Sequence, residues 1–242
     1  MPDEMVWSQV QGHLATLVPE RDAELQAMEA KARETSFPIV GPVAGHLCYL
    51  VARMVGARRV FEMGSGFGYS TAWFARAVRE NGGGEVHHVV WDDALSARAR
   101  EHLARLGLDE TVRFHVGEAV QTLRGANGVF DLIFNDIDKE GYPDSLAAIA
   151  AKLRPGGVLI VDNALWHGRV FDESDATKAT RGVRELTRRL AADPSWITSL
   201  LPVRDGLLLA LRVAAPRGAA GRTRHRADSH GVAGGRPAGG LR

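Results

Sequence analysis

From Arg58 onward the chain alternates between short apolar runs and longer amphipathic stretches. The runs, rich in β-branched residues, predict strands at 59–62, 86–91, 112–115, 129–135 and 157–161. The stretches between them predict helices at 70–80, 95–106, 118–123 and 145–153. Strands separated by helices of this length form βαβ units, so we expect an α/β fold with a doubly wound, mainly parallel sheet that is covered on both faces.

The segments on either side complete this architecture. Helical spacing of apolar residues predicts helices within about 3–35, a segment that Pro19 punctuates, over 43–55 and over about 176–191. The runs 196–202 and 207–213 flank Arg204-Asp205-Gly206, a turn that favours an antiparallel hairpin at the sheet edge. We therefore expect one Rossmann-like domain over residues 1–213, with N-terminal helices and an antiparallel C-terminal hairpin.

Composition narrows the class of protein. The 242 residues are 45% hydrophobic and 24% charged, which suits one sizeable core and favours one domain over two. Six arginines and one aspartate follow Val213, so the tail carries +5 and the rest of the chain, within a net charge of +1, carries −4. An acidic body is not typical of nucleic-acid-binding proteins, and we expect no nucleic-acid partner. The Gly/Ala/Arg/Pro-rich tail, 214–242, predicts a disordered, solvated appendage rather than a segment that binds RNA or an acidic partner.

Neither the N-terminus nor the cysteine content suggests export. The chain starts without a basic and apolar leader, and no apolar stretch approaches the length of a membrane span, so we expect no membrane partner. The only cysteine, Cys48, excludes an intrachain disulfide, and its apolar surroundings predict a small core residue. The expected location is the cytoplasm.

Two of the predicted strands end abruptly in oxygen-bearing side chains. Asp136 closes the run that begins at residue 131, and Asp162 and Asn163 close the run that begins at residue 156. If the strands are parallel neighbours, these side chains meet at the carboxyl edge of the sheet, where open α/β sheets bind ligands. Two carboxylates and a carboxamide suit Mg²⁺, or Mn²⁺ or Ca²⁺, better than zinc or copper. Lys139 places an amine beside that cation, which eases loss of its proton and allows it to act as a base.

A glycine-rich turn follows the first predicted strand, in the run Glu62-Met-Gly-Ser-Gly-Phe-Gly-Tyr-Ser70. Its Gly-x-Gly-x-Gly spacing places Tyr69 where a dinucleotide fingerprint has its third glycine, which disfavours NAD. Glu62 can hold an ammonium, while the Ser70 hydroxyl and the amides at the helix start can hold a carboxylate. These are the two ends of the amino-acid part of S-adenosylmethionine. A turn without a ligand is the alternative, and the strand-end oxygens favour the cofactor.

On these motifs the chain resembles the cation-dependent class I O-methyltransferases, the catechol and caffeoyl-CoA O-methyltransferase family. The similarity covers about residues 35–213, and several motifs occur in the family's order and spacing: 39–45, 61–70, 134–139, 161–163 with 165–170, and 201–207. The resemblance implies transfer of the S-adenosylmethionine methyl group to one hydroxyl of a catechol-like, vicinal dihydroxy aromatic small molecule. It also implies a homodimer formed through the N-terminal helices.

The resemblance implies roles for individual residues as well. The cation would be bound by Asp136, Asp162 and Asn163, with Asp136 and Lys139 in catalytic roles and Lys139 as the base. The cofactor site would be formed by Val40, Gly41, Glu62, Gly64, Ser65, Gly66, Tyr69, Ser70, Gly117, Ala119 and Asp136. The family's ribose-binding acid falls at Val90 in this chain, so we expect Asp92 to replace it through a small shift of the strand end.

Two other functions remain open. A methyltransferase of the same fold can act on a sugar hydroxyl or an amine, and assays with labelled cofactor would separate these substrates. A non-catalytic S-adenosylmethionine-binding module has no need for a base beside a metal, so the set Asp136, Lys139, Asp162 and Asn163 argues against it.

Overall fold

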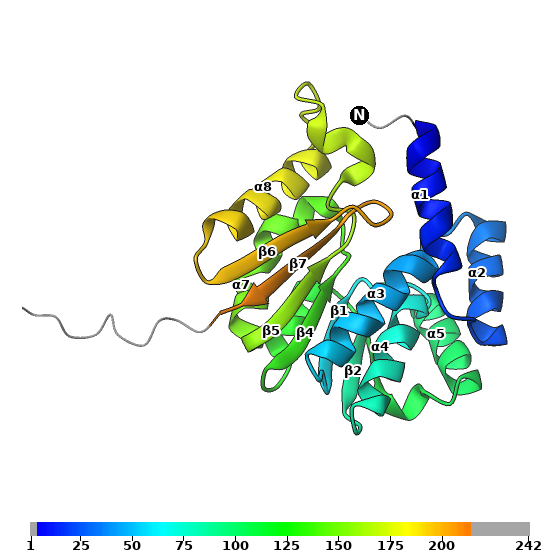
Figure 1. Cartoon of the computed structure of the whole chain (residues 1–242). Coiled ribbons are helices and arrows are strands. Elements are labelled where there is room, and N and C mark those ends of the chain that lie inside the picture. Colours follow the sequence, from blue (N-terminus) through cyan, green and yellow to red (C-terminus); the bar gives the residue numbers. More distant parts are fainter. Residues whose placement is uncertain (1–3, 214–242) are drawn as a thin grey trace, which may run out of the picture.

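The computed structural model describes residues 4–213, which form a seven-stranded sheet flanked by helices (Figure 1). The strands are β1 (Arg59–Met63), β2 (Glu85–Val90), β3 (Val112–Val116), β4 (Phe130–Asn135), β5 (Leu153–Val161), β6 (Trp196–Leu201) and β7 (Leu207–Arg212). Their order is β3-β2-β1-β4-β5-β7-β6, with β3 to β5 parallel and the β6–β7 hairpin antiparallel. The predicted mainly parallel sheet with a C-terminal hairpin is confirmed.

Helices cover both faces of the sheet. They are α1 (Glu4–Thr16), α2 (Ala23–Thr35), α3 (Gly41–Met54), α4 (Tyr69–Glu80), α5 (Asp93–Arg105), α6 (Ala119–Gly125), α7 (Tyr142–Lys152) and α8 (Lys178–Ala192). One apolar core joins the sheet to α2, α3, α4 and α5, and a second joins its other face to α6, α7 and α8. None of the helices within residues 4–213 combines the length and apolar character that a bilayer span needs.

The N-terminal helical segment is divided into α1 and α2, and Pro19 lies in the break, as its position in the sequence predicted. The start of one strand differs from the sequence-based expectation. Strand β5 begins at Leu153 instead of Gly157, because Leu153 pairs with Phe130 before a register shift brings Val158 opposite Leu132. The Pro155-Gly156-Gly157 segment therefore lies inside an irregular strand rather than before it. The expected tail, 214–242, lies outside the described residues.

Helix α8 packs closely on the short turn Lys139–Gly141. A Cβ atom on Gly182 would lie 2.0 Å from the carbonyl oxygen of Lys139, far inside van der Waals contact. Because glycine has no side chain, helix α8 can pack directly against the backbone carbonyl of Lys139.

A chain of buried polar side chains joins β2 to the end of β1. The Nδ1 atom of His88 lies 3.0 Å from the Thr71 hydroxyl, and that hydroxyl donates to Oε2 of Glu62. Burial lowers the pKa of His88 to about 3, so the imidazole is neutral at physiological pH. Both contacts are satisfied when neutral His88 carries its proton on Nδ1. The contacts between His88, Thr71 and Glu62 thereby hold the Glu62 carboxylate at the carboxyl end of β1.

Replacing Gly182 with Ala should lower the free energy of unfolding by about 1–3 kcal/mol, because the new methyl group must push α8 and the Lys139 turn apart. Urea unfolding would measure the change. Gly12→Ala is the matched control, since Gly12 is exposed in α1 and a Cβ there would meet no atom within 4 Å. That substitution should stabilise the protein by about 0.5–1 kcal/mol. Equal stability of Gly182→Ala and the parent would contradict the close packing.

The His88 pKa predicts a loss of stability in mild acid. The unfolded imidazole binds a proton below about pH 6.5, whereas the buried one stays neutral, so the free energy of unfolding should fall as the pH drops from 6.5 towards 4. His88→Asn keeps a donor for Thr71 but removes the titration, and should flatten this slope in chemical unfolding from pH 4 to 8. Burial also lowers the pKa values of His87 and His115, so part of the slope should remain. The exposed His13→Asn should keep the parental slope. A slope unchanged in His88→Asn would contradict the assignment.

Candidate functional site

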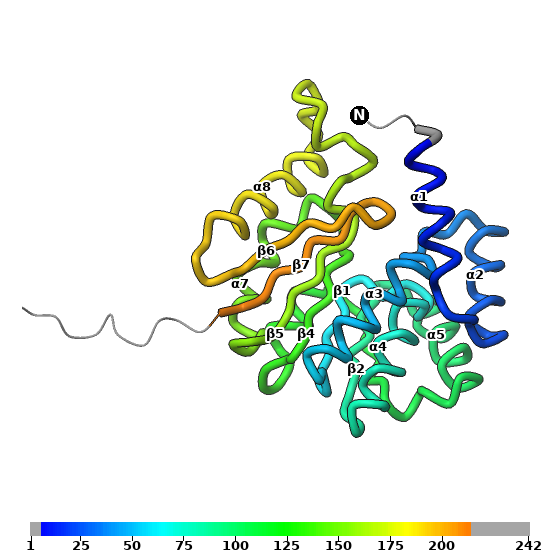
Figure 2. The backbone as a smooth tube through the Cα atoms, in the orientation of Figure 1, coloured from blue at the N-terminus to red at the C-terminus, as the bar shows by residue number. Residues whose placement is uncertain are grey.

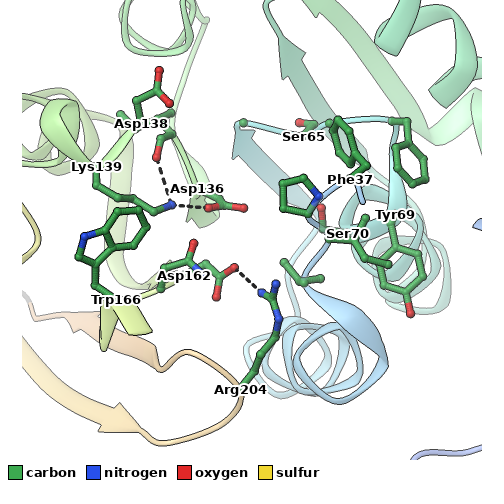
Figure 3. Close-up of a pocket in the computed structure, with 18 of the residues that line it drawn as sticks. Phe37, Ser65, Tyr69, Ser70, Asp136, Asp138, Lys139, Asp162, Trp166 and Arg204 are labelled. Atoms are coloured by element: carbon green, nitrogen blue, oxygen red, sulfur yellow. Dashed lines mark hydrogen bonds and ion pairs between the residues drawn. The ribbon is translucent and has the colours of Figure 1, made fainter. Parts of the chain in front are cut away.

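A pocket of about 500 Å³ opens at the carboxyl edge of the sheet, where β1 and β4 lie side by side (Figure 3). The strand order reverses between these two strands, and such switch points are the usual ligand sites of open α/β sheets. The predicted residues that line the pocket are Val40, Gly64, Ser65, Gly66, Tyr69, Ser70, Asp136, Lys139, Asp162 and Asn163. The structure thus brings the glycine turn and the strand-end oxygens to one cavity.

The glycine turn comes very close to the end of β4. The backbone N–H of Asp136 donates to the carbonyl of Met63 at 2.9 Å, and a Cβ on Gly64 would lie 2.3 Å from the Asp136 carbonyl oxygen. Gly64 also has φ +89°, a conformation that side chains rarely tolerate. On its other side, the Ser65 hydroxyl accepts a hydrogen bond from the Val89 N–H at 2.9 Å. The turn is therefore held on both sides by neighbouring strands.

Lys139 and Asp136 form an ion pair at one wall of the pocket. The Lys139 ammonium lies 2.7 Å from Oδ1 of Asp136 and donates to the Ile137 carbonyl at 3.2 Å (Figure 3). Only 9% of the Lys139 side chain is exposed, and its Nζ atom lies 4.9 Å from the centre of the Tyr142 ring. Burial raises the pKa of Asp136, and Lys139 opposes that shift. The amine is thus held within the pocket wall beside a carboxylate.

Asp162 lies on the adjacent strand end and is almost fully buried. Its Oδ2 atom accepts a hydrogen bond from Arg204 at 3.2 Å, while its buried Oδ1 atom has no partner among residues 4–213. Burial and the nearby Asp136 carboxylate both raise the pKa of Asp162. A buried carboxylate oxygen without a donor is unfavourable unless a ligand satisfies it.

Asn163 is oriented by a residue that the sequence analysis missed. Its side-chain amide donates to Oδ2 of buried Asp205 at 3.1 Å, which leaves the carboxamide oxygen as the remaining acceptor. The second Asp205 oxygen accepts from the backbone N–H of His167. Asn163, Trp166 and His167 all have positive φ values, between +48° and +54°, so Asp205 supports a strained loop.

The donor set fits a hard divalent cation. Asp136, Asp162 and Asn163 supply carboxylate and carboxamide oxygens in one pocket, and Oδ1 of Asp162 is an unsatisfied oxygen there. Within residues 4–213, no three His, Cys, Asp or Glu side chains gather closely enough to hold a metal ion. The expected site therefore depends on the Asn163 carboxamide as its third protein donor.

The other predicted cofactor residues lie outside the pocket lining. Glu62 is buried beneath the glycine turn, and its Oε1 atom has no partner among the described residues. Burial raises the pKa of Glu62, and the nearby hydroxyls of Ser70 and Thr71 oppose that shift. Gly41 begins α3, and Ala119 begins α6 just after Gly117. The amide of Gly117 donates to the Val90 carbonyl at 2.9 Å.

Asp92 has a structural contact in addition to its predicted role. Its Oδ1 atom caps α5 by accepting the Leu95 N–H at 2.9 Å, one turn into the helix. Asp92 is exposed and follows the end of β2, whereas Val90 is buried. The expectation that Asp92 binds the ribose of the cofactor stays a prediction.

Arg204 lines the pocket and, like Asp205, was missed by the sequence analysis. The segment Arg204-Asp205-Gly206 signals only a hairpin turn, because nothing in its local pattern shows which strand lies beside it. The observed order places β7 next to β5, so the hairpin loop lies against Asp162 and Asn163. The strand order would have been needed to find both residues.

Comparison with known proteins identifies the family of this chain. A family model described as O-methyltransferase matches residues 18–213. A catechol O-methyltransferase of Niastella koreensis is 29% identical over 220 residues, covering 86% of this chain and 99% of that protein.

Solved structures give the same relationship. The O-methyltransferase TomG of Streptomyces achromogenes, in complex with SAM, has a TM-score of 0.78 and 29% identity, covering 88% of this chain and 100% of its own. An O-methyltransferase of Bacillus cereus in complex with SAH has a TM-score of 0.77 and 27% identity, covering 86% and 99%. The chain therefore belongs to the S-adenosylmethionine-dependent O-methyltransferase family.

Proposed function

We propose that this protein is a divalent-cation-dependent O-methyltransferase that methylates one hydroxyl of a vicinal dihydroxy aromatic small molecule. The observation that carries the proposal is the placement of Asp136, Asp162 and Lys139 in one pocket with the glycine turn. The related catechol O-methyltransferase of Niastella koreensis supports the substrate class.

The glycine turn is the proposed site for the methionyl part of the cofactor. Glu62 offers an unsatisfied buried carboxylate oxygen for an ammonium, and Ser70 at the start of α4 offers a hydroxyl beside free amides for a carboxylate. Val40, Gly41, Gly64, Ser65, Gly66 and Tyr69 would complete this part, while Asp92, Gly117 and Ala119 would serve the ribose and adenine.

Asp136, Asp162 and Asn163 are the proposed cation ligands. When bound, a divalent cation such as Mg²⁺, or Mn²⁺ or Ca²⁺, would lower the pKa of a substrate hydroxyl and hold two adjacent hydroxyls in place. The Asp205 contact turns the Asn163 oxygen away from the hairpin loop, and the Arg204 contact leaves Oδ1 of Asp162 available. Both neighbours thus orient the donors that a cation would use.

Lys139 is the proposed base. After losing its own proton, the neutral Lys139 amine would accept the hydroxyl proton at Nζ as the hydroxyl oxygen attacks the methyl carbon, so that an O–C bond forms and the C–S bond breaks. The Asp136 carboxylate, 2.7 Å away, stabilises the resulting ammonium. Trp166 and Phe37 line the same pocket and offer aromatic surfaces for the substrate ring.

The proposal also covers the cellular location, the oligomeric state and the domain organisation of the protein. We infer a cytoplasmic homodimer with a single catalytic domain over residues 1–213. The N-terminal segment supports the dimer because Val6 and Val10 of α1, and Leu17 directly after it, expose 47%, 41% and 64% of their surfaces. Cys48 is buried and unpaired, as in proteins of a reducing compartment.

Removing a proposed cation ligand should abolish the activity that Mg²⁺ adds. Asp136→Ala and Asp162→Ala should each reduce Mg²⁺-stimulated methylation of a catechol panel, read by mass spectrometry, to the level seen with EDTA. Asp144→Ala is the matched control, since Asp144 is exposed on α7 and outside the pocket. Full activity of the parent in EDTA would refute the role of the metal.

Lys139→Met should lower kcat by about 10²- to 10⁴-fold, because the variant keeps much of the side-chain volume but cannot accept a proton. Cofactor affinity, measured by calorimetry, should change little, since Lys139 contacts Asp136 and Ile137 rather than the glycine turn. A variant with parental kcat would exclude Lys139 as the base. Loss of cofactor binding alone would make it a structural residue.

A further inference from the structure

Arg204 has unused hydrogen-bonding capacity inside the pocket. Within residues 4–213 its guanidinium makes a single hydrogen bond, the 3.2 Å contact to Asp162. By contrast, the Arg184 guanidinium donates to four backbone carbonyls, and Arg59 donates to Glu85 and two carbonyls. A guanidinium has five N–H donors in a planar fork, so most of the capacity of Arg204 remains for a ligand.

The loop that carries Arg204 is held in place from outside the sheet. The side-chain oxygen of Gln11, in α1, accepts the Arg204 backbone N–H at 3.0 Å, and its amide donates to the Pro202 carbonyl. Figure 2 shows the loop between β6 and β7 next to α1. Arg204 adopts φ +52°, a left-handed conformation that few non-glycine residues take. The structure thus maintains an unfavourable backbone state that presents this side chain to the cavity.

The charges around the pocket favour an acidic group on the ligand once the cofactor and cation of the proposed function are bound. Its lining includes three aspartates, at 136, 138 and 162, and two cations, Lys139 and Arg204. A divalent cation and the sulfonium raise this net charge from about −1 to about +2, and one ionised substrate hydroxyl leaves about +1. An additional carboxylate would balance the remaining charge.

We propose that Arg204 binds a carboxylate carried by the substrate, so that the preferred substrates are dihydroxy aromatic acids. This inference rests on the proposed function and specifies its substrate class. The carboxylate would pair with the open N–H groups of the guanidinium, and such charge-assisted, bidentate contacts are among the stronger and more geometrically selective polar interactions. Asp162 binds one side of the Arg204 guanidinium, and this contact orients the N–H groups that remain for the substrate.

The test compares acids with their uncharged methyl esters. Initial rates with Mg²⁺ and S-adenosylmethionine would be measured for 2,3-dihydroxybenzoate, 3,4-dihydroxybenzoate, 3,4-dihydroxyphenylacetate and the three esters. For at least one pair we expect the parent to show about 10- to 100-fold higher kcat/KM on the acid, mainly through a lower KM. Arg204→Gln should bring that acid-to-ester ratio close to one, and Arg204→Lys should keep part of it.

Arg181→Gln is the matched control, because it removes the same charge from an exposed site on α8 that does not line the pocket. It should keep the parental acid-to-ester ratio. Thermal unfolding and cofactor calorimetry would establish that each variant is folded and loaded, and Arg204→Lys supplies the ratio should Arg204→Gln unfold.

The outcomes separate this inference from the proposed function. Acid-to-ester ratios below about threefold for all three pairs, or a preference that survives in Arg204→Gln, would overturn the carboxylate site while leaving the methyltransferase intact. Failure of the parent to methylate any of the six compounds would overturn the proposed function and the inference with it.

Discussion

The close approach of β1 and β4 at their carboxyl ends is the constraint on which the rest of the pocket depends. Because the Gly64 backbone lies against the Asp136 carbonyl, no side chain fits between the glycine turn and the acidic strand end. A cofactor on the turn and a substrate beside Asp136 would therefore share one cavity, with little protein between them. Such proximity is what transfer of a small group between two bound molecules requires.

The charged side chains of the pocket also connect separate parts of the fold. Lys139 neutralises Asp136 from a turn supported by α8, while Arg204 neutralises Asp162 from the hairpin loop. Removing one partner of a buried pair is costly because it leaves an uncompensated charge. The pocket walls are thus tied to the sheet, the hairpin and an outer helix at once, which favours a rigid arrangement of the proposed donors.

Much of the architecture was predictable because its signals are local. The alternation of apolar runs with helical spacing predicts the strands and helices, and the residues after two runs predict which side chains meet at the sheet edge. The start of β5 was less accessible, since Leu153 joins the sheet only through its pairing with Phe130. Arg204 and Asp205 were missed because their importance depends on β7 lying beside β5, a long-range fact. The connection of His88 through Thr71 to Glu62 was also inaccessible, because it joins residues from three separate elements.

Gln11 stabilises a part of the structure outside its own helix, α1. It holds the hairpin loop through two backbone contacts almost two hundred residues away in the chain. Helix α1 thus stabilises the loop between β6 and β7 that carries Arg204. Truncating α1 beyond Gln11 would remove both contacts to this loop, although no residue that lines the pocket had been altered. A redesign of the N-terminal region that removes Gln11 would therefore also remove both contacts that hold the Arg204 backbone beside the cavity.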